Sequence, residues 1–131
     1  MTMSGRYLLD TNIIIALFAD DASVKANLAK VDEVFASSIV IGELCFGALK
    51  SNRPVENLAR IDEFAANIAV LNCDTDTGRR YGEIKDALRL KGRPVPENDV
   101  WIASIARQND LILVTRDAHF NEIANVRIIS W

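Results

Sequence analysis

Short apolar segments of strand type alternate with helical segments along almost the whole chain. The run 111–114 has four apolar residues in succession, which is typical of a strand buried on both faces. Elsewhere apolar residues recur at three- and four-residue spacing, as Tyr81, Ile84 and Leu88 do, which indicates a helix. Because parallel neighbouring strands need crossover connections, this alternation predicts an α/β fold, in which a mainly parallel central sheet is flanked by helices in three layers.

The expected ranges of the elements follow from the apolar pattern and from capping residues. Strands are expected at 7–9, 33–36, 68–71, 111–114 and 126–130. Helices are expected at 13–18, 21–31, 39–49, 54–68 and 75–90, with a last one after Asn98 and Asp99. The first of these is predicted as a helix despite its β-branched isoleucines, because Asp10, Thr11 and Asn12 provide N-cap side chains before it. Asn98 and Asp99 are expected to cap the last helix in the same way.

Length and composition exclude several classes of protein. The 131 residues, half of them hydrophobic and a quarter charged, fit one folded domain over residues 1–131 and argue against disorder. The formal net charge of −3 excludes a uniformly basic nucleic-acid-coating protein. Cys45, Cys73 and the single histidine, His119, are too few and too scattered for a zinc finger or a disulfide framework. The longest uncharged run, 64–73, is too short for a membrane span, and the first residues lack signal-peptide features, so we expect a cytoplasmic protein.

Four acidic residues stand where a solvated surface does not explain them. Asp10 ends the first predicted strand, and Asp117 follows shortly after the buried run 111–114. Asp99 opens the last predicted helix, and Glu43 is the only charged residue between Glu33 and Lys50. Each also has a purely structural interpretation. Asp10 and Asp99 can be helix caps, and Asp117 can be a turn residue. Glu43 can lie on an exposed stripe or pair with an arginine.

Taken together, the four acids point to a cation site. The carboxyl ends of parallel strands meet at one edge of the sheet, where ligands collect in open α/β folds. Two carboxylates about 4 Å apart repel each other by about 4 kcal/mol at an effective dielectric constant of about 20, and protonation or a bound cation must relieve that cost. No cluster of histidines or cysteines accompanies the acids, so we expect a hard cation that prefers oxygen ligands, Mg²⁺ or Mn²⁺.

Each of the four acids sits in a short motif. The motifs are Leu8-Leu9-Asp10-Thr11-Asn12, Ser37-Ser38-x4-Glu43-Leu44, Asn98-Asp99-x2-Ile102-Ala103 and Leu113-Val114-Thr115-x-Asp117-x2-Phe120. In order and spacing they resemble the motif series of PIN-domain ribonucleases, and in particular the VapC toxins of toxin–antitoxin pairs. The resemblance spans residues 10–120. It implies that Asp10, Glu43, Asp99 and Asp117 are catalytic and metal-binding carboxylates, with Thr115 as a catalytic hydroxyl and Asn12 and Asn98 as supporting residues.

The resemblance also implies an activity and partners. The protein would be a Mg²⁺- or Mn²⁺-dependent endoribonuclease that hydrolyses RNA phosphodiester bonds with water activated by a carboxylate-bound ion. It would act as a toxin, be inhibited by a cognate VapB-like antitoxin protein and form a homodimer, for which the apolar face of 54–68 is a suitable surface. Some family members carry a further acid just after the last motif, where this chain has Ala118 and His119, so the number of ions stays open.

Basic residues concentrate before the third motif. They are Arg79, Arg80, Lys85, Arg89, Lys91 and Arg93, and Arg116 stands beside the fourth acid. We expect them to contact RNA phosphates around the acidic site. The alternative is a solvated helix face with ion pairs such as Arg79–Glu83.

Two other functions compete with the nuclease. An aspartate-based phosphohydrolase also places an aspartate at a strand end, although such enzymes favour Asp-x-Asp where this chain has Asp10-Thr11-Asn12. A non-catalytic PIN relative that binds RNA or protein is the other alternative, although such proteins usually lose some of the acids. His119 is isolated in the sequence, so we expect it to be structural and not to take part in acid–base catalysis.

Overall fold

A five-stranded sheet in which every strand is parallel to its neighbours forms the centre of the computed structural model, which describes residues 3–131. The strands are β1 (Met3–Leu9), β2 (Val31–Ser37), β3 (Ala69–Leu71), β4 (Ile112–Val114) and β5 (Ile128–Ile129). Their order across the sheet is β3-β2-β1-β4-β5. The predicted parallel sheet is therefore confirmed.

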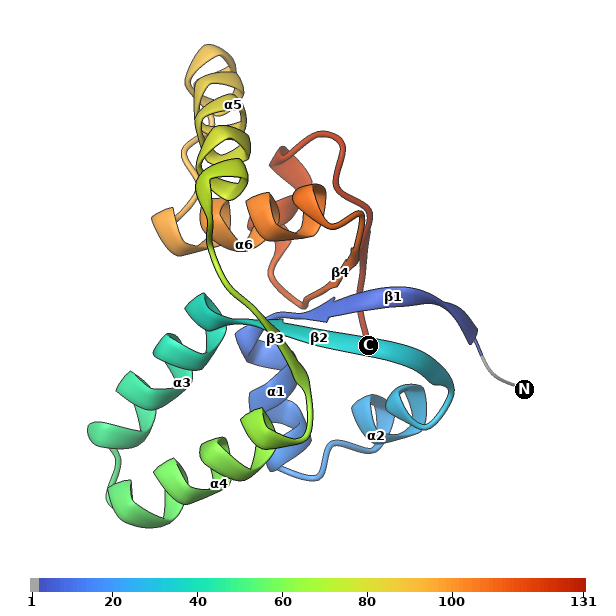
Figure 1. Ribbon diagram of the computed structural model, residues 1–131, viewed down its shortest axis with the longest axis vertical. Coiled ribbons are helices and arrows are strands. Elements are labelled where there is room, and N and C mark those ends of the chain that lie inside the picture. Colours follow the sequence, from blue (N-terminus) through green and yellow to red (C-terminus); the bar gives the residue numbers. More distant parts are fainter. Residues whose placement is uncertain (1–2) are drawn as a thin grey trace.

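Helices cover both faces of this sheet. They are α1 (Thr11–Phe18), α2 (Ala22–Leu28), α3 (Ser38–Leu49), α4 (Pro54–Ala66), α5 (Thr75–Lys91) and α6 (Glu97–Gln108), with a 3₁₀ turn η1 (Ala118–Glu122). Figure 1 shows α1 to α4 on one side of the sheet and α5 with α6 on the other. The three-layer α/β architecture is thus as predicted, and none of the helices within 3–131 has the length and apolarity that a bilayer span requires.

The order of the strands creates a switch point beside β1. The chain builds outward from β1 through β2 to β3, then crosses back and adds β4 and β5 on the other side of β1. β1 and β4 are paired in register, with Leu9 opposite Val114. The residues that follow these two strands therefore leave the sheet side by side at its carboxyl edge, which is where ligands bind in folds of this kind.

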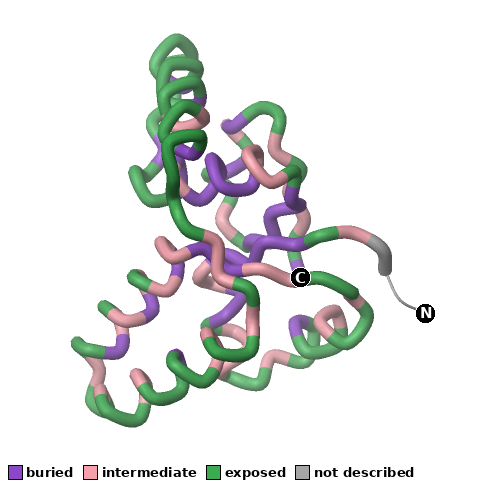
Figure 2. Tube along the Cα trace, viewed as in Figure 1, coloured by how far each residue is buried: buried purple, intermediate pink, exposed green. Residues whose placement is uncertain are grey.

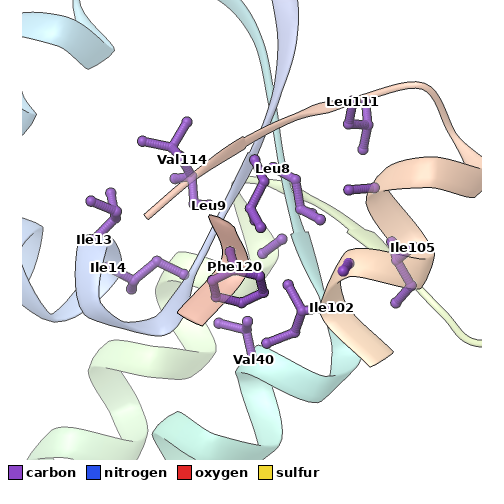
Figure 3. Close-up of a cluster of buried hydrophobic side chains, with 14 of the residues drawn as sticks. Leu8, Leu9, Ile13, Ile14, Val40, Ile102, Ile105, Leu111, Val114 and Phe120 are labelled. Carbon is purple, nitrogen blue, oxygen red and sulfur yellow. The ribbon is translucent and has the colours of Figure 1, made fainter. Parts of the chain in front are cut away.

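The core lies between the central strands and the helices. Leu8, Leu9, Leu113 and Val114 on β1 and β4 are almost completely buried, and Phe120 of η1 is completely buried among them. Figure 3 shows side chains from both strands, α1, α3, α6 and η1 in this cluster, and Figure 2 shows that α5 is exposed along most of its length. Full burial of side chains of this size contributes about 1.5–3 kcal/mol each, so the core fixes the strand ends rigidly.

Several predicted boundaries were wrong. The helix expected at 21–31 ends at Leu28, because the chain already pairs with β1 from Val31 onward. The strand expected at 126–130 is reduced to Ile128–Ile129.

The apolar face of α4, which we expected to be free for a dimer contact, packs on the core instead, where Ile61 is buried.

The start of α6 also differs from the prediction, and the difference bears on the site. Its N-cap is Pro96, which has no capping side chain, and the Asp99 backbone N–H donates to the Pro96 carbonyl oxygen at 3.0 Å. Asn98 and Asp99 consequently lie in the first turn and are not the caps. The Asp99 carboxylate therefore does not cap α6.

Candidate active site

Asp10 is fixed at the end of β1 by hydrogen bonds to both of its carboxylate oxygens. It is the N-cap of α1, and the Thr11 backbone N–H donates to Asp10 Oδ1 at 2.8 Å. The Thr115 hydroxyl, which follows β4, donates to Asp10 Oδ2 at 2.7 Å. Burial raises the pKa of Asp10 above its usual value of 3.8, with a smaller rise from Glu43 and Asp117, while the hydrogen bonds from Thr115 and Thr11 oppose the rise. The predicted capping role of Asp10 is therefore confirmed, and the same carboxylate lies among the other acids.

Asn12 and Thr115 tie the two strand ends together. The Asn12 side-chain amide lies 3.4 Å from both Asp10 Oδ2 and the Thr115 hydroxyl oxygen, and Asn12 Oδ1 accepts the Arg116 backbone N–H at 3.2 Å. The Thr115 hydroxyl oxygen also accepts the Asp117 backbone N–H at 3.0 Å. This network fixes the direction in which the Asp117 carboxylate leaves the sheet edge.

Glu43 reaches the same edge from α3. The Thr11 hydroxyl donates to Glu43 Oε1 at 2.9 Å, which links the second acidic motif to the first. The side chain is half-buried, and none of the ion pairs found among residues 3–131 involves it. The alternative in which an arginine neutralises Glu43 is therefore not what the structure shows.

Asp99 carries the largest electrostatic perturbation of the group. Its side chain in the first turn of α6 is buried. Burial raises its pKa from 3.8 to about 7, and the charges of Asp10, Asp117 and Glu43 contribute in that order, with a hydrogen bond to Asp117. The four predicted acids thus influence one another directly, although they come from four distant parts of the chain.

His119, which was expected to be structural, lies directly beside one of the four acids. Asp117 is the N-cap of η1, and this tight turn brings residue 119 back over it. The His119 backbone N–H donates to Asp117 Oδ1 at 2.9 Å, and His119 Nδ1 lies 2.8 Å from the same oxygen. Ligand atoms of Asp99, Asp117 and His119 all lie within 4.8 Å of one another. The spacing Asp-x-His before an aromatic residue was the only sequence signal for this contact.

Asn98 lies on the open side of the site. It is exposed and lines a pocket of about 720 Å³ together with Thr11, Ile15, Glu43 and Phe46. Unlike Asn12, it has no hydrogen bond to the acids in the part of the chain that the structure describes. Asn98 therefore lies at the wall of the open pocket and not among the acids.

Most of the predicted RNA-contacting cations are held by carboxylates. Lys85 pairs with Glu97 at 2.6 Å, Arg89 with Asp86 at 2.6 Å, Arg80 with Asp76 at 3.8 Å, and Lys91 and Arg93 with Glu122 at 3.5 and 4.0 Å. Arg79 is exposed and takes part in none of the ion pairs found in residues 3–131, because its suggested partner Glu83 lies beside Arg107.

Arg116 is turned away from the acids. Its guanidinium donates to Asp21 Oδ2 at 3.0 Å and to the Trp131 carbonyl oxygen at 2.8 Å. Trp131 itself packs against Tyr7, with ring centroids 5.8 Å apart. The side chain of Arg116 thus anchors the loop after β4 to its surroundings, in place of the phosphate or partner contact expected of it.

The acidic cluster fits a divalent cation. Its donors are carboxylate oxygens with one imidazole nitrogen, and burial together with the neighbouring acids raises the pKa of Asp99, so a bound cation would relieve the cost of ionising it. Carboxylates held in this way suit Mg²⁺ and Mn²⁺, whereas thiolate-preferring ions would find no cysteine, because Cys45 and Cys73 are free thiols outside the cluster.

Comparison with known proteins places this geometry in a family. A model of the PIN domain matches residues 7–126. "Ribonuclease VapC2" of Haemophilus influenzae is 33% identical over 132 residues, which cover 96% of this chain and 98% of the relative. "tRNA(fMet)-specific endonuclease VapC" of Shigella flexneri is 36% identical over 129 residues, with the same coverage. The crystal structure of VapBC2 from Rickettsia felis, bound to a DNA fragment from their promoter, contains a chain that superposes with a TM-score of 0.88 at 30% identity, covering 98% of this chain and 99% of that one. With its four acids gathered at the switch point of a parallel sheet, the chain belongs to the PIN domain family.

Proposed function

We propose that this protein is a metal-dependent endoribonuclease and the toxin of a toxin–antitoxin pair. The observation that carries the proposal is the convergence of Asp10, Glu43, Asp99 and Asp117 on one sheet edge, where burial, with a smaller contribution from the other three acids, raises the pKa of Asp99 to about 7. The relatives named as VapC ribonucleases match over nearly their whole length, which supports the same reaction for this chain. We also propose that residues 1–131 act as one domain, since the sheet and the family match span most of them.

The four carboxylates would hold Mg²⁺ or Mn²⁺. When bound, such a cation supplies positive charge that offsets the charge developing on the phosphodiester, and it makes water acidic enough to lose a proton near neutral pH. Asp99 is buried beside Asp10 and Asp117, so the cation would relieve the repulsion that its ionised carboxylate otherwise meets there.

The other residues would orient these groups. The Thr115 hydroxyl holds Asp10 through its 2.7 Å hydrogen bond and Asp117 through the backbone, so it keeps two carboxylates in fixed directions. Asn12 braces both strand ends, and Asn98 faces the open pocket, where a substrate group can contact it. We therefore propose supporting roles for Thr115, Asn12 and Asn98 around the four acids.

RNA would approach along the basic residues of α5 and the loop after it. Arg79 is exposed and outside any ion pair found in residues 3–131, while Lys85, Arg89, Lys91 and Arg93 are exposed and held in surface ion pairs. Exposed ion pairs contribute only about 0–1 kcal/mol, so a phosphate can displace the carboxylate partner at small cost. The cations thus remain available for a polyanion.

The antitoxin would bind the apolar groove beside the acids. Ile15 and Phe46 are exposed on α1 and α3, and both line the pocket of about 720 Å³ that also contains Glu43. A second pocket of about 290 Å³ between α1, α3 and α4 continues from it. A VapB-like segment in this groove would cover the site, and the VapBC complexes among the structural relatives support such a partner.

A homodimer would use a different apolar surface. We assign this contact to Leu49 and Val55, which are exposed at the junction of α3 and α4.

The direct test measures RNA cleavage by the purified protein. Cleavage is expected with Mg²⁺ or Mn²⁺, to stop with EDTA, to leave 5′-phosphate and 3′-hydroxyl ends, and to disappear in Asp99→Asn. The matched control is Asp76→Asn, which removes an exposed carboxylate from the first turn of another helix and should cleave normally. Equal cleavage by Asp99→Asn and the control would refute the site. A substrate of this kind also implies that the protein works in the cytoplasm.

A further inference from the structure

An imidazole nitrogen lies at the edge of the acidic cluster, and the proposed reaction makes no use of it. His119 Nδ1 is 2.8 Å from Asp117 Oδ1, and a ligand atom of Asp99 lies within 4.8 Å of both residues' ligand atoms. Neighbouring ligands of a six-coordinate ion with bonds of about 2.1 Å are about 3.0 Å apart. The separation of the nitrogen and the oxygen is therefore close to the spacing of two adjacent ligands of one metal ion.

The ring is free to serve as a ligand. The side chain of His119 is 58% exposed, and within residues 3–131 its only hydrogen-bonding contact is with Asp117. Its position is nevertheless fixed, because the His119 backbone N–H also donates to Asp117 and the next residue, Phe120, is completely buried in the core. The backbone thus holds the imidazole beside Asp117, with much of the ring exposed to an incoming ion.

We infer that His119 supplies a nitrogen ligand at the Asp99–Asp117 end of the cluster and biases it toward a first-row transition ion over Mg²⁺. This inference rests on the proposed function, which already places a cation among the acids. Mg²⁺ binds almost entirely through oxygen ligands, whereas imidazole is a common ligand of first-row transition ions such as iron, nickel, copper and zinc, and Mn²⁺ is the first and weakest binder of that series. A site with two carboxylates and one imidazole therefore discriminates between cations that a purely carboxylate site would bind alike.

The chain allows an unusually clean test, because His119 is its only histidine. Any imidazole nitrogen detected at a bound Mn²⁺ in untagged protein must come from this residue. Electron spin echo spectroscopy of the Mn²⁺-loaded protein should show ¹⁴N imidazole coupling, which should vanish in His119→Gln. Titration calorimetry should show that His119→Gln weakens Mn²⁺ binding at least about tenfold, with less than about a threefold change for Mg²⁺.

A second variant separates ligation from packing. His119→Asp restores a ligand but with oxygen, so it should bind Mg²⁺ more tightly than the wild type while showing no ¹⁴N coupling. Mn²⁺ binding by the wild type without ¹⁴N coupling would overturn the inference and make His119 only a hydrogen-bond partner of Asp117. In that case RNA cleavage by the wild type would leave the proposed function intact, whereas the absence of any metal binding and of cleavage would overturn both.

Discussion

Replacing Asp99 with asparagine should stabilise the EDTA-treated protein against unfolding above pH 7. The fold raises the pKa of Asp99 from 3.8 to about 7 because it buries the carboxyl group beside Asp10 and Asp117. That increase corresponds to at most about 4 kcal/mol of unfavourable interaction when the group is ionised. Asparagine has nearly the same shape without the charge, so the variant escapes this cost. It loses a favourable interaction with the α6 macrodipole, but that is worth only about 0.3–1 kcal/mol.

The pH dependence gives the sign of the effect. Because the folded state binds the Asp99 proton more tightly than the unfolded state, the contribution of this proton to stability is complete below about pH 4 and is lost as the pH rises through about 7. The wild type should therefore lose stability across this interval, in addition to changes from other groups. The difference between Asp99→Asn and the wild type should be small near pH 4 and grow to a maximum above pH 7.

Urea unfolding followed by circular dichroism, in EDTA at several pH values, measures this difference. Asp76→Asn is the matched control, since Asp76 lies in the first turn of α5 but is half-exposed, and it should show no stabilisation at any pH. Mg²⁺ at 100 times its dissociation constant should remove most of this difference, because it stabilises the wild type by about 2.7 kcal/mol, whereas the variant has lost one of the carboxylates that would hold the ion. A variant that is less stable than the wild type at pH 8 in EDTA would show that the acids are structural and not mutually repulsive.

Three further predictions concern the support of the site and its substrate. Thr115→Val should destabilise the fold by about 1–3 kcal/mol in urea unfolding, because buried Asp10 loses its 2.7 Å hydrogen bond; an unchanged midpoint would argue against that bond. Phe120→Ala should cost about 3–5 kcal/mol and lower the melting temperature, since the ring is completely buried; a loss below about 1 kcal/mol would contradict its place in the core. Arg89→Glu combined with Arg93→Glu should weaken RNA binding by an inactive Asp99→Asn protein and reduce the slope of affinity against salt by about 2; an unchanged slope would place the RNA elsewhere.

Local sequence patterns were sufficient to predict where a residue lies when its position depends on the residues adjacent to it in the chain. Asp10 could be placed because it follows an apolar strand, whereas Thr115 was assigned from the resemblance to PIN-domain ribonucleases, and the paired strands bring the two together. The start of α6 was misplaced because Pro96 caps it with a backbone carbonyl, which leaves no side-chain signal. The prediction that Asn98 and Asp99 cap α6 was therefore wrong, because this helix begins without a capping side chain.

Contacts between distant segments were beyond the sequence patterns. The ion pairs of Lys85 with Glu97 and of Lys91 with Glu122 join α5 to α6 and η1, so no spacing rule along one helix could find them. Arg116 was assigned to RNA because it neighbours Asp117, yet its side chain runs to Asp21 and Trp131. His119 was expected to be structural because it is the only histidine in the chain. Only the 3₁₀ turn shows that its side chain contacts a carboxylate two residues away.

The distribution of the four acids along the chain has a consequence during protein synthesis. The first stands at position 10 and the last at position 117 of 131, and β4 must insert beside β1 before Thr115 can reach Asp10. A growing polypeptide on the ribosome thus carries no assembled centre until residues 112–117 have emerged and β4 has paired with β1. Nearly all of the helices and strands have therefore been synthesised before the four acids can come together.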